Sequence, residues 1–474
     1  MILAAGEGTR MRSSVPKVLH ELCGVPLILR VLNTVRELKP VSIGVIVGHG
    51  GKEVIDRLKG SAADVDFLWQ KAQKGSGHAV KTAAPWLKKS LKISPNVMVL
   101  CADTPLVRSK TLKSLFDTHC IGKNGATILT ADFSNPFGYG RIKRDSGRRV
   151  EGIVEEKDAG PEERNIKEVN SGIYFFDTGK LLDAIPLIRN DNAKKEYYLT
   201  DVVGLFYGRN VPVETLRMSE EDALVDNMGV NSRVDLALAE SILQKEITER
   251  WMREGVTILN PASVYIGENV AIGRDAVILP GTMLLGQTAI GERSVIGPNS
   301  YVEDSKIGEN ALVRASYVFG SVVGNYVLIG PFSHLRKGNV VRDGAKIGNF
   351  CEIKNSAIGK KTKVPHLSYV GDSALGENVN VGAGTITCNY DGKLKHKTVV
   401  GSGVFIGSNV NLVAPVKIGA GAVLGAGSTI TNDVPPGALA LERSGQVVKK
   451  GWAKNRAVKA EIKNEKPARR VCGG

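Results

Sequence analysis

An aliphatic residue recurs every six positions through most of the second half of the chain, and this spacing constrains the fold more than any other feature. The series runs through Ile266, Ile272, Ile278, Leu284, Ile290, Ile296 and Val302, then from Ile329 to Ile353, and then from Val400 to Ile430. A unit of six residues cannot bury its aliphatic side chain alone, so successive units must stack on one another. The spacing therefore predicts a parallel β-helix of hexapeptide repeats over residues 256–451.

The first half follows a different pattern. Residues 1–231 alternate short runs of valine, isoleucine and leucine with amphipathic stretches, as in "VSIGVIVGHG", "NVMVLCAD" and "SGIYFFD". Strands that alternate with helical segments predict an α/β domain with a parallel sheet and crossover helices. Residues 232–255 have helical spacing and end at Gly255, so we expect a linker helix between the two halves.

The net charge of +15 is concentrated at the end of the chain. Residues 449–474 hold nine lysines or arginines and two glutamates, which is +7 and leaves the other 448 residues with +8. A basic segment of this kind can contact nucleic acid or anionic lipid, but it has almost no apolar periodicity. We therefore interpret residues 452–474 as a disordered, solvated tail and expect no nucleic-acid partner.

The six cysteines are scattered, and none forms a CxxC pair. This arrangement argues against a disulfide framework or a zinc site and favours a reducing cytoplasm. We find no signal-peptide pattern and no uninterrupted apolar run of about 18 residues, so we expect no membrane insertion.

A glycine-bearing turn follows the first apolar segment, in "ILAAGEGTRM". Its glycines let backbone N–H groups approach an anion, and Arg10 and Lys17 could supply countercharge. The turn matches neither GxxxxGK[ST] nor GxGxxG, so by itself it does not distinguish a phosphate-binding loop from an ordinary strand-to-helix turn.

An ordered set of sequence motifs indicates which of these two interpretations of the turn applies. "LAAGEGTRM…PKVLH", "QKAQKGSGHA", "CADTPL", "GYGRI", "GIVEEKDA", "VNSGIY" and "GVNSR" occur in the order found in sugar-nucleotide pyrophosphorylases. Together with the repeats, residues 1–452 resemble the bacterial bifunctional N-acetylglucosamine-1-phosphate uridyltransferases and glucosamine-1-phosphate acetyltransferases. Members of that family usually carry several residues before "ILAAG" and often a lysine at position 7, so we expect a shortened first strand and an altered phosphate contact at Glu7.

The resemblance implies a Rossmann-like nucleotidyltransferase domain followed by a left-handed parallel β-helix. It implies acetyl transfer from acetyl-CoA to glucosamine-1-phosphate, and then uridylyl transfer from UTP to N-acetylglucosamine-1-phosphate with release of pyrophosphate. Relatives form trimers whose acetyl site is shared between neighbouring subunits, so a homotrimer is expected here.

Uridylyl transfer is a direct attack of the sugar phosphate on the α-phosphorus of UTP, so catalysis consists of positioning and charge neutralisation. Mg²⁺ typically takes only one or two protein ligands in such sites. Asp103 follows the apolar strand "NVMVLCAD" and is the natural first ligand, and the family pattern adds Asn231. The resemblance implies nucleotide binding by Leu3, Ala4, Ala5, Gly6, Lys17, Gln70, Gly75, Ser76, Cys101, Ala102 and Asp103, and sugar binding by Gly140, Glu155, Asn170 and Asn231.

The repeat register gives a second inference that does not depend on the resemblance. If three hexads form one coil, His366, Ala383, Ser408 and Ala426 should form one column with a spacing of ~4.8 Å. Arg336 and Lys354 should stack in the same way, and two stacked cations repel each other unless an anion such as a sugar phosphate lies beside them. The segment "CNYDGKLKHK" breaks the six-residue spacing and should therefore loop out of the coil.

The resemblance assigns roles to these positions. His366 would be the general base that takes a proton from the amino group, so that nitrogen can attack the thioester. The amino-sugar phosphate would be held by Arg336, Lys354, Tyr369 and Asn380, and acetyl-CoA by Ala383, Asn389, Tyr390, Ser408, Ala426 and Arg443, with Lys395 in the looped segment.

Two other functions fit the same two-part plan. The chain could be a nucleotidyltransferase whose β-helix only oligomerises or binds an effector, or a non-enzymatic interaction subunit. Intact His366, Arg336 and Lys354 argue against the first alternative. Intact Asp103, Lys17 and Asn231 argue against the second.

Overall fold

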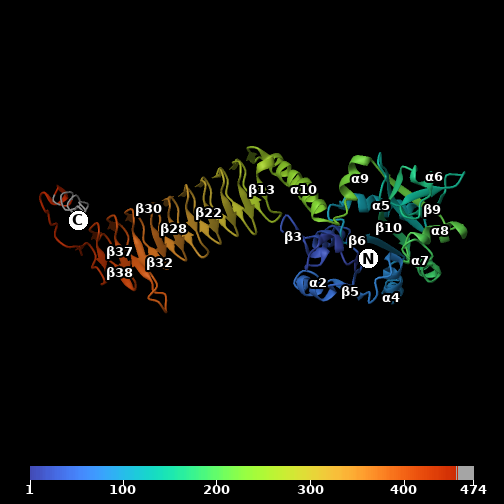
Figure 1. Cartoon of the computed structure of the whole chain (residues 1–474), viewed down its shortest axis with the longest axis horizontal. Coiled ribbons are helices and arrows are strands. Elements are labelled where there is room, and N and C mark those ends of the chain that lie inside the picture. The colour runs from blue at the N-terminus through green and yellow to red at the C-terminus, as the bar shows by residue number, and fades with distance from the viewer. Residues whose placement is uncertain (455, 457–474) are drawn as a thin grey trace, which may run out of the picture. The chain divides into compact units, whose positions relative to one another are not determined.

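The computed structural model describes residues 1–454 and 456, and the chain divides into two compact units (Figure 1). The N-terminal unit is Met1–Ala289 and the C-terminal unit is Ile290–Gly474. Residues 452–454 have helical backbone, and most of the predicted disordered tail lies outside the described residues.

The N-terminal unit is built on a nine-stranded mixed sheet. The main path has the order β11 (Val213–Met218), β7 (Ala126–Asp132), β10 (Glu168–Asp177), β6 (Asn96–Cys101), β1 (Ile2–Ala4), β4 (Ile43–Val47) and β5 (Val65–Trp69), with β8 (Arg141–Arg144) and β9 (Val150–Val154) beside β10. Strands β6, β1, β4 and β5 are parallel, as predicted.

Strand β10 departs from the predicted parallel arrangement, because it is antiparallel to both β6 and β7. A parallel return needs a long crossover connection, which is usually a helix. The chain between β7 and β10 instead forms the antiparallel β8–β9 hairpin and the four-residue α6 (Pro161–Arg164). The sheet is therefore mixed: the predicted parallel pairing holds for β6, β1, β4 and β5 and not for β10.

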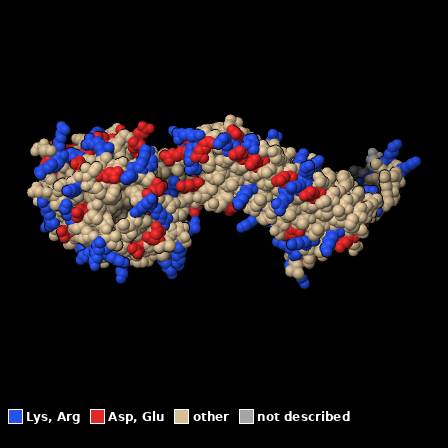
Figure 2. Space-filling model, turned by 180° about the vertical axis from the view of Figure 1, so that it is seen from behind, with Lys and Arg blue, Asp and Glu red and all other residues tan. Residues whose placement is uncertain are grey.

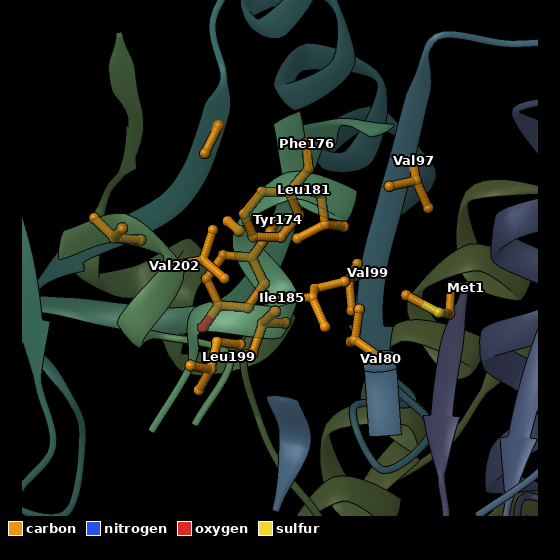
Figure 3. Packing of buried hydrophobic residues seen from close by; sticks show 14 of the residues in the cluster. Met1, Val80, Val97, Val99, Tyr174, Phe176, Leu181, Ile185, Leu199 and Val202 are labelled. Carbon is orange, nitrogen blue, oxygen red and sulfur yellow. The ribbon is translucent and has the colours of Figure 1, made fainter. Parts of the chain in front are cut away.

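Helices cover both faces of this sheet, and neighbouring residues of one strand serve opposite faces. Val99 and Phe176 pack into one hydrophobic cluster, whereas Leu100 and Phe175 pack into the other. Figure 3 shows the first cluster, where Val99 lies between Met1 and the side chains of β10, α7 and α8. The helices are α1 (Leu27–Glu37), α2 (Gly51–Leu58), α3 (Ser76–Thr82), α4 (Ala84–Leu91), α5 (Ser109–Gly122), α7 (Thr178–Ala184), α8 (Asp201–Gly208) and α9 (Glu220–Asp226), and the short elements are η1 (Thr9–Met11), η2 (Lys17–Leu19), β2 (Glu21–Leu22), β3 (Val25–Pro26) and η3 (Ile185–Leu187). Because both faces are covered, the central strands are buried, and side chains that contact a ligand must come from the strand ends.

Helix α10 (Arg233–Arg253) lies where the linker helix is predicted. Ser232 caps its first turn by accepting a hydrogen bond from the backbone N–H of Asp235, and the Asp235 carboxylate accepts one in return from the backbone N–H of Ser232. This reciprocal pair satisfies N–H groups that would otherwise have no partner at the helix start.

The six-residue repeat begins within the N-terminal unit. Strand β12 pairs with β15 and β13 with β16, both in parallel, and Ile266 faces Leu284 one coil later. These first elements are β12 (Thr257–Ile258), η4 (Pro261–Ser263), β13 (Tyr265–Ile266), β14 (Ala271–Ile272), β15 (Val277–Ile278), β16 (Met283–Leu285) and β17 (Ala289–Ile290).

In the C-terminal unit every third strand joins the same parallel sheet, which gives a three-sided β-helix. The first side contains β18 (Val295–Ile296), β21 (Leu312–Val313), β24 (Leu328–Ile329), β27 (Lys346–Asn349), β30 (Lys363–His366), β33 (Asn380–Val381), β36 (Phe405–Ile406), β39 (Val423–Leu424) and β41 (Leu439–Ala440). The second side contains β19 (Tyr301–Glu303), β22 (Tyr317–Phe319), β25 (His334–Leu335), β28 (Glu352–Lys354), β31 (Tyr369–Gly371), β34 (Ile386–Cys388), β37 (Asn411–Val413) and β40 (Thr429–Ile430). The third side contains β20 (Lys306–Ile307), β23 (Val322–Val323), β26 (Val340–Val341), β29 (Ala357–Ile358), β32 (Ser373–Leu375), β35 (Thr398–Val400) and β38 (Val416–Ile418). The predicted parallel β-helix of hexapeptide repeats is confirmed.

The interior of the stack contains a line of buried polar side chains, which we call the polar spine (Ser305, Ser321, Asn339, Ser356 and Ser373). In most coils the side chain of the spine residue accepts a hydrogen bond from the backbone N–H of the next spine residue. The N–H of Ser321 donates to the Ser305 hydroxyl at 3.1 Å, and the N–H of Ser356 donates to Oδ1 of Asn339 at 3.0 Å. Ser373 donates in the same way to the Ser356 hydroxyl at 3.0 Å. These bonds satisfy buried backbone groups and link each coil to its neighbour.

The predicted interruption is present as a hairpin. Residues 389–397 leave the stack between β34 and β35, and Tyr390 and Lys395 form an antiparallel bridge within it. It is the orange hairpin that projects near β32 in Figure 1. After this hairpin the chain rejoins the stack, where β35 pairs in parallel with β32 and β38.

Charged side chains of both signs occur on the face of each unit shown in Figure 2. On this face the lysines and arginines are interspersed with aspartates and glutamates rather than gathered into one stripe. Among the described residues, no helix combines the length and the apolar character needed to cross a membrane.

Candidate active sites

A cleft of about 470 Å³ opens at the carboxyl ends of β1 and β6. Ligand sites in open α/β sheets form at this edge because parallel strands end there together. Ten of the residues expected to bind nucleotide line the cleft, namely Leu3, Ala4, Ala5, Gly6, Lys17, Gln70, Gly75, Ser76, Cys101 and Asp103. Ala102 does not line it and is fully buried behind the strand end.

Glu7, Gln73 and Glu196 also line this cleft, although only Glu7 was singled out from the sequence. Gln73 donates a hydrogen bond of 2.8 Å to the carbonyl oxygen of Ala5 and so ties its loop to the glycine turn. Gly8 has a φ of 63°, and a Cβ there would lie 2.6 Å from Cβ of Lys17. Glycine at this position therefore lets the turn close onto Lys17.

Three parts of the chain converge on the ammonium group of Lys17. It donates to Oδ2 of Asp103 in a short ion pair and to Oδ1 of Asn231 at 3.2 Å. Arg10 donates to the same Asn231 oxygen at 2.9 Å. The backbone N–H of Val230 donates to the carbonyl oxygen of Asp103 at 2.8 Å, which holds the segment before Asn231 against the end of β6. The two predicted metal ligands thus face one positive charge.

Gly140, Glu155 and Asn170 form a second group beside this cleft. The backbone N–H of Asn170 donates to Gly140 at 2.9 Å, and a Cβ on Gly140 would lie 3.6 Å from Cδ of Glu155. Burial raises the pKa of Glu155, against a 3.3 Å hydrogen bond from Thr200 that acts in the opposite direction. Asn231 lies with Lys17 rather than in this group.

Tyr174 connects this group with the cleft. Its hydroxyl accepts a 2.7 Å hydrogen bond from Asn170. Burial raises the pKa of Tyr174, and the nearby Glu155 and Cys101 raise it further. Because Cys101 lines the cleft, the expected sugar-binding residues adjoin the expected nucleotide-binding residues.

The column predicted around His366 is present in the C-terminal unit. Strand pairing places Lys363 beside Asn380, Val381 beside Ile406, and Ile406 beside Leu424 in successive coils. The same register carries His366, Ala383, Ser408 and Ala426 into one column. Arg443 joins it by donating a 3.0 Å hydrogen bond to the carbonyl oxygen of Ala426.

The His366 ring is exposed, and its Nδ1 lies 3.0 Å from Oδ1 of Asn349. The sequence reasoning missed Asn349. The register could have found it, because Asn349 precedes His366 by 17 residues and the two are paired across β27 and β30.

Arg336 and Lys354 stack as predicted, since Leu335 and Ile353 are paired in adjacent coils. Lys395 of the hairpin joins them, and its hydrogen bonding and charge lower the pKa of Lys354, with burial and Arg336 adding to the effect. Arg336 also forms a 3.1 Å ion pair with Glu352, which the sequence reasoning did not predict. A cluster of three cations at one place favours an anionic ligand.

Polar residues border these cations. Asn389 donates to the Asp372 carboxylate at 2.5 Å and to the Tyr369 hydroxyl at 3.4 Å. Tyr390 is exposed and donates to the carbonyl oxygen of Gly392 at 2.7 Å. Asn380 lies on another side of the coil, beside Lys363. Tyr369 and Asn389 therefore adjoin the cations, whereas Asn380 is closer to the His366 column.

An exposed apolar ladder (Phe332, Phe350 and Leu367) runs along one corner of the coil next to His366. The Phe332 and Phe350 rings stack with centroids 5.5 Å apart, and each side chain is more than half exposed. Contiguous exposed apolar side chains of this kind are typical of interaction surfaces.

Family comparisons match both halves of the chain. A MobA-like NTP transferase domain matches residues 1–159, and a bacterial transferase hexapeptide model matches residues 269–304 and 397–432. A GlmU-like C-terminal hexapeptide model matches residues 293–381, which include Arg336, Lys354 and His366.

Curated relatives match over almost the whole chain. A "Bifunctional protein GlmU" from Caldanaerobacter subterraneus subsp. tengcongensis is 49% identical and covers 98% of this chain and 99% of its own length. The protein of that name from Heliobacterium modesticaldum is 48% identical, over 95% of this chain and 97% of its own. Among solved structures, a putative glucose-1-phosphate thymidylyltransferase from Bacillus anthracis matches 51% of this chain and 93% of its own length, at 19% identity and a TM-score of 0.40.

Proposed function

This chain belongs to the GlmU family of bifunctional proteins, and on that premise we propose which of its residues carry each of the two reactions. It is a bifunctional enzyme of UDP-N-acetylglucosamine synthesis. It acetylates glucosamine-1-phosphate with acetyl-CoA and transfers a uridylyl group from UTP to N-acetylglucosamine-1-phosphate, releasing pyrophosphate. The observation that carries the residue assignment is that Asp103 and His366 lie in different units, each among partners of different chemistry.

In the first site, the residues that line the cleft beside β1 and β6 hold UTP. Lys17 and Arg10 lie where they can neutralise phosphate charge as the sugar phosphate attacks and pyrophosphate leaves. Gly140, Glu155 and Asn170 hold the sugar, because they form a compact polar group next to the cleft. Glu155 can accept a hydrogen bond from a sugar hydroxyl when its carboxyl is ionised.

Asp103 and Asn231 are the proposed Mg²⁺ ligands. Both direct an oxygen atom at the same ammonium group, so two hard donors already converge on one positive charge. No group of three or more His, Cys, Asp or Glu in the described part of the chain is placed to hold a metal, which suits an ion that completes its shell with phosphates and water. When bound, Mg²⁺ would neutralise phosphate charge.

In the second site, His366 is the proposed general base. It accepts the proton that the amino group of glucosamine-1-phosphate loses as nitrogen bonds to the thioester carbon, and the thiolate of coenzyme A leaves. Arg336, Lys354 and Lys395 hold the sugar phosphate, and Tyr369 adjoins them. Asn380 contributes to the amino-sugar site from the neighbouring side of the coil, beside the His366 column. Acetyl-CoA is held by Ala383, Ser408, Ala426 and Arg443 at the His366 column, and by Asn389 and Tyr390 at the start of the hairpin.

We also propose a homotrimer with the acetyl site at the contact between subunits. The apolar ladder supports this, because Leu367 follows His366 directly and is 63% exposed in the single chain. The cytoplasm is the proposed location, supported by the free thiols of Cys23, Cys101, Cys120, Cys351 and Cys388.

The experiment that tests the function supplies glucosamine-1-phosphate, acetyl-CoA, UTP and Mg²⁺ and identifies the products by mass. UDP-N-acetylglucosamine, free coenzyme A and pyrophosphate should all appear. Chelation of Mg²⁺ should stop pyrophosphate release and leave coenzyme A release intact. The absence of both free coenzyme A and pyrophosphate from the complete mixture would disprove the function.

A further inference from the structure

The strand that carries His366 lies close to the strand before it, as the coils do at other repeat glycines such as Gly382 and Gly407. A Cβ on Gly348 would lie 2.5 Å from the carbonyl carbon of Pro365, which is less than any side chain tolerates. Only glycine at 348 therefore allows β27 and β30 to meet in this way. The backbone N–H of Leu367 donates to the carbonyl oxygen of Asn349 at 3.0 Å, which locks the two coils together at the corner.

This close approach places two side chains against each other. Asn349 and His366 are paired in register, and Oδ1 of Asn349 lies 3.0 Å from Nδ1 of His366. An amide oxygen can only accept a hydrogen bond, so Nδ1 carries the proton. The other ring nitrogen, Nε2, is then left with a free lone pair.

The backbone of His366 is held separately. Ser368 donates a 2.7 Å hydrogen bond to the carbonyl oxygen of His366. The charged side chains of the two strands are Lys346 and Lys363, and the next strand in the sheet places Asn380 beside Lys363. The ring orientation is therefore set through Asn349, whose amide is neutral.

We infer that Asn349 is a positioning residue for acetyl transfer: it fixes His366 in the tautomer whose Nε2 can accept the proton of the attacking amine. This inference rests on the proposed role of His366 as general base. The opposite tautomer would present an N–H group to the amine and could not accept the proton. After the transfer both ring nitrogens carry hydrogen, and the amide oxygen of Asn349 still accepts from Nδ1–H, so the interaction persists through the step.

Two substitutions separate this role from simple packing. Asn349→Leu keeps the side-chain size and removes the acceptor, so kcat for acetyl transfer should fall about 10-fold to 100-fold while KM for both substrates changes little. Asn349→Asp keeps an acceptor and adds a negative charge that favours the imidazolium. It should therefore retain kcat at high pH and move the acid limb of the pH profile upward by about one unit.

The matched control is Asn411→Leu. Asn411 is a partly buried asparagine in a later coil, where its amide donates a 3.5 Å hydrogen bond to Thr429. This variant should keep the wild-type pH profile. Thermal melting of each protein checks folding, and if Asn349→Leu melts early, the acid-limb shift of Asn349→Asp decides, because a packing role would not move it.

The outcomes distinguish the inference from the function on which it rests. If His366→Ala retains acetyl transfer, the proposed base is wrong. If His366→Ala is inactive but Asn349→Leu and Asn349→Asp keep the wild-type kcat and pH profile, the role of Asn349 is wrong and that of His366 stands. Loss of activity in a well-folded Asn349→Asp also overturns the inference, because it would show that the amide donates to the ring.

Discussion

Gly348→Ala should disable acetyl transfer and leave uridylyl transfer intact. The new Cβ would lie 2.5 Å from the carbonyl carbon and 2.8 Å from Cα of Pro365, whereas ordinary contacts begin at 3.4 Å. The coil that carries His366 must therefore move by about 1 Å, because the obstacle is backbone and cannot rotate away. A displacement of about 1 Å at a catalytic group can lower the rate about 100-fold. Overpacking of this kind also costs about 1–3 kcal/mol of stability.

The matched control is Gly267→Ala, at a repeat glycine whose added Cβ would meet its nearest atom at 3.5 Å. Coenzyme A release is measured with glucosamine-1-phosphate and acetyl-CoA, and pyrophosphate release with supplied N-acetylglucosamine-1-phosphate and UTP. The control should be normal in both assays, and Gly348→Ala only in the second. Wild-type acetyl transfer and an unchanged melting temperature in Gly348→Ala would show that the coil spacing does not place His366 as argued.

His366→Ala should lower the rate of acetyl transfer by a factor of ~10²–10⁴ and leave uridylyl transfer unchanged. Asp103→Ala should lower the rate of uridylyl transfer and leave acetyl transfer unchanged. Loss of both half-reactions in either well-folded variant would refute the two-site assignment. Arg336→Ala and Lys354→Ala should raise KM for glucosamine-1-phosphate more than KM for acetyl-CoA, since a charge-assisted hydrogen bond contributes roughly 1.5–3 kcal/mol; equal changes in the two KM values would contradict a phosphate role. Burial and the carboxylates of Asp191, Glu155 and Asp158 raise the pKa of Asp201 from 3.8 to about 6, so its contribution to stability is present below about pH 4 and lost as the pH rises through 6. Asp201→Asn should thus raise the melting temperature at pH 7.5 and have little effect at pH 4, and an equal shift at both pH values would exclude this cause. Phe350→Ser should lower the trimer fraction in sedimentation and reduce acetyl transfer, whereas an unchanged fraction would show that the apolar ladder is not the contact surface.

The two sites differ in how much of them could be predicted from the sequence. The column at His366 followed from the repeat register, once the coils that are one residue shorter than three hexads and the looped segment are counted: His366 and Ala383 are 17 residues apart, and Ser408 and Ala426 are 18 apart. The same arithmetic reaches Asn349. It does not reach Glu352, which contacts Arg336 from a different column of the neighbouring coil.

In the N-terminal unit, no repeat length allows neighbouring residues to be predicted from their sequence separation. Lys17 is 86 residues from Asp103 and 214 from Asn231, and their meeting depends on how the strands are ordered in the sheet. Only the resemblance to known enzymes singled out Asn231. The direction of a strand also cannot be predicted from the sequence in this unit. The apolar run of β10 has the same pattern whether the strand pairs in parallel or, as here, antiparallel to its neighbours.

Because of the polar spine, the β-helix can gain or lose length only in whole coils. The side chains of Ser305, Asn339 and Ser356 each satisfy a backbone N–H group in the next coil, so removing a complete coil away from His366 brings one spine residue against another and restores the bonds. Removing a single residue reverses which side chains face inward, so a serine or asparagine of the spine would turn outward and leave buried N–H groups without partners. Duplication and loss of coils are therefore changes that this architecture can absorb, and single-residue insertions within strands are not.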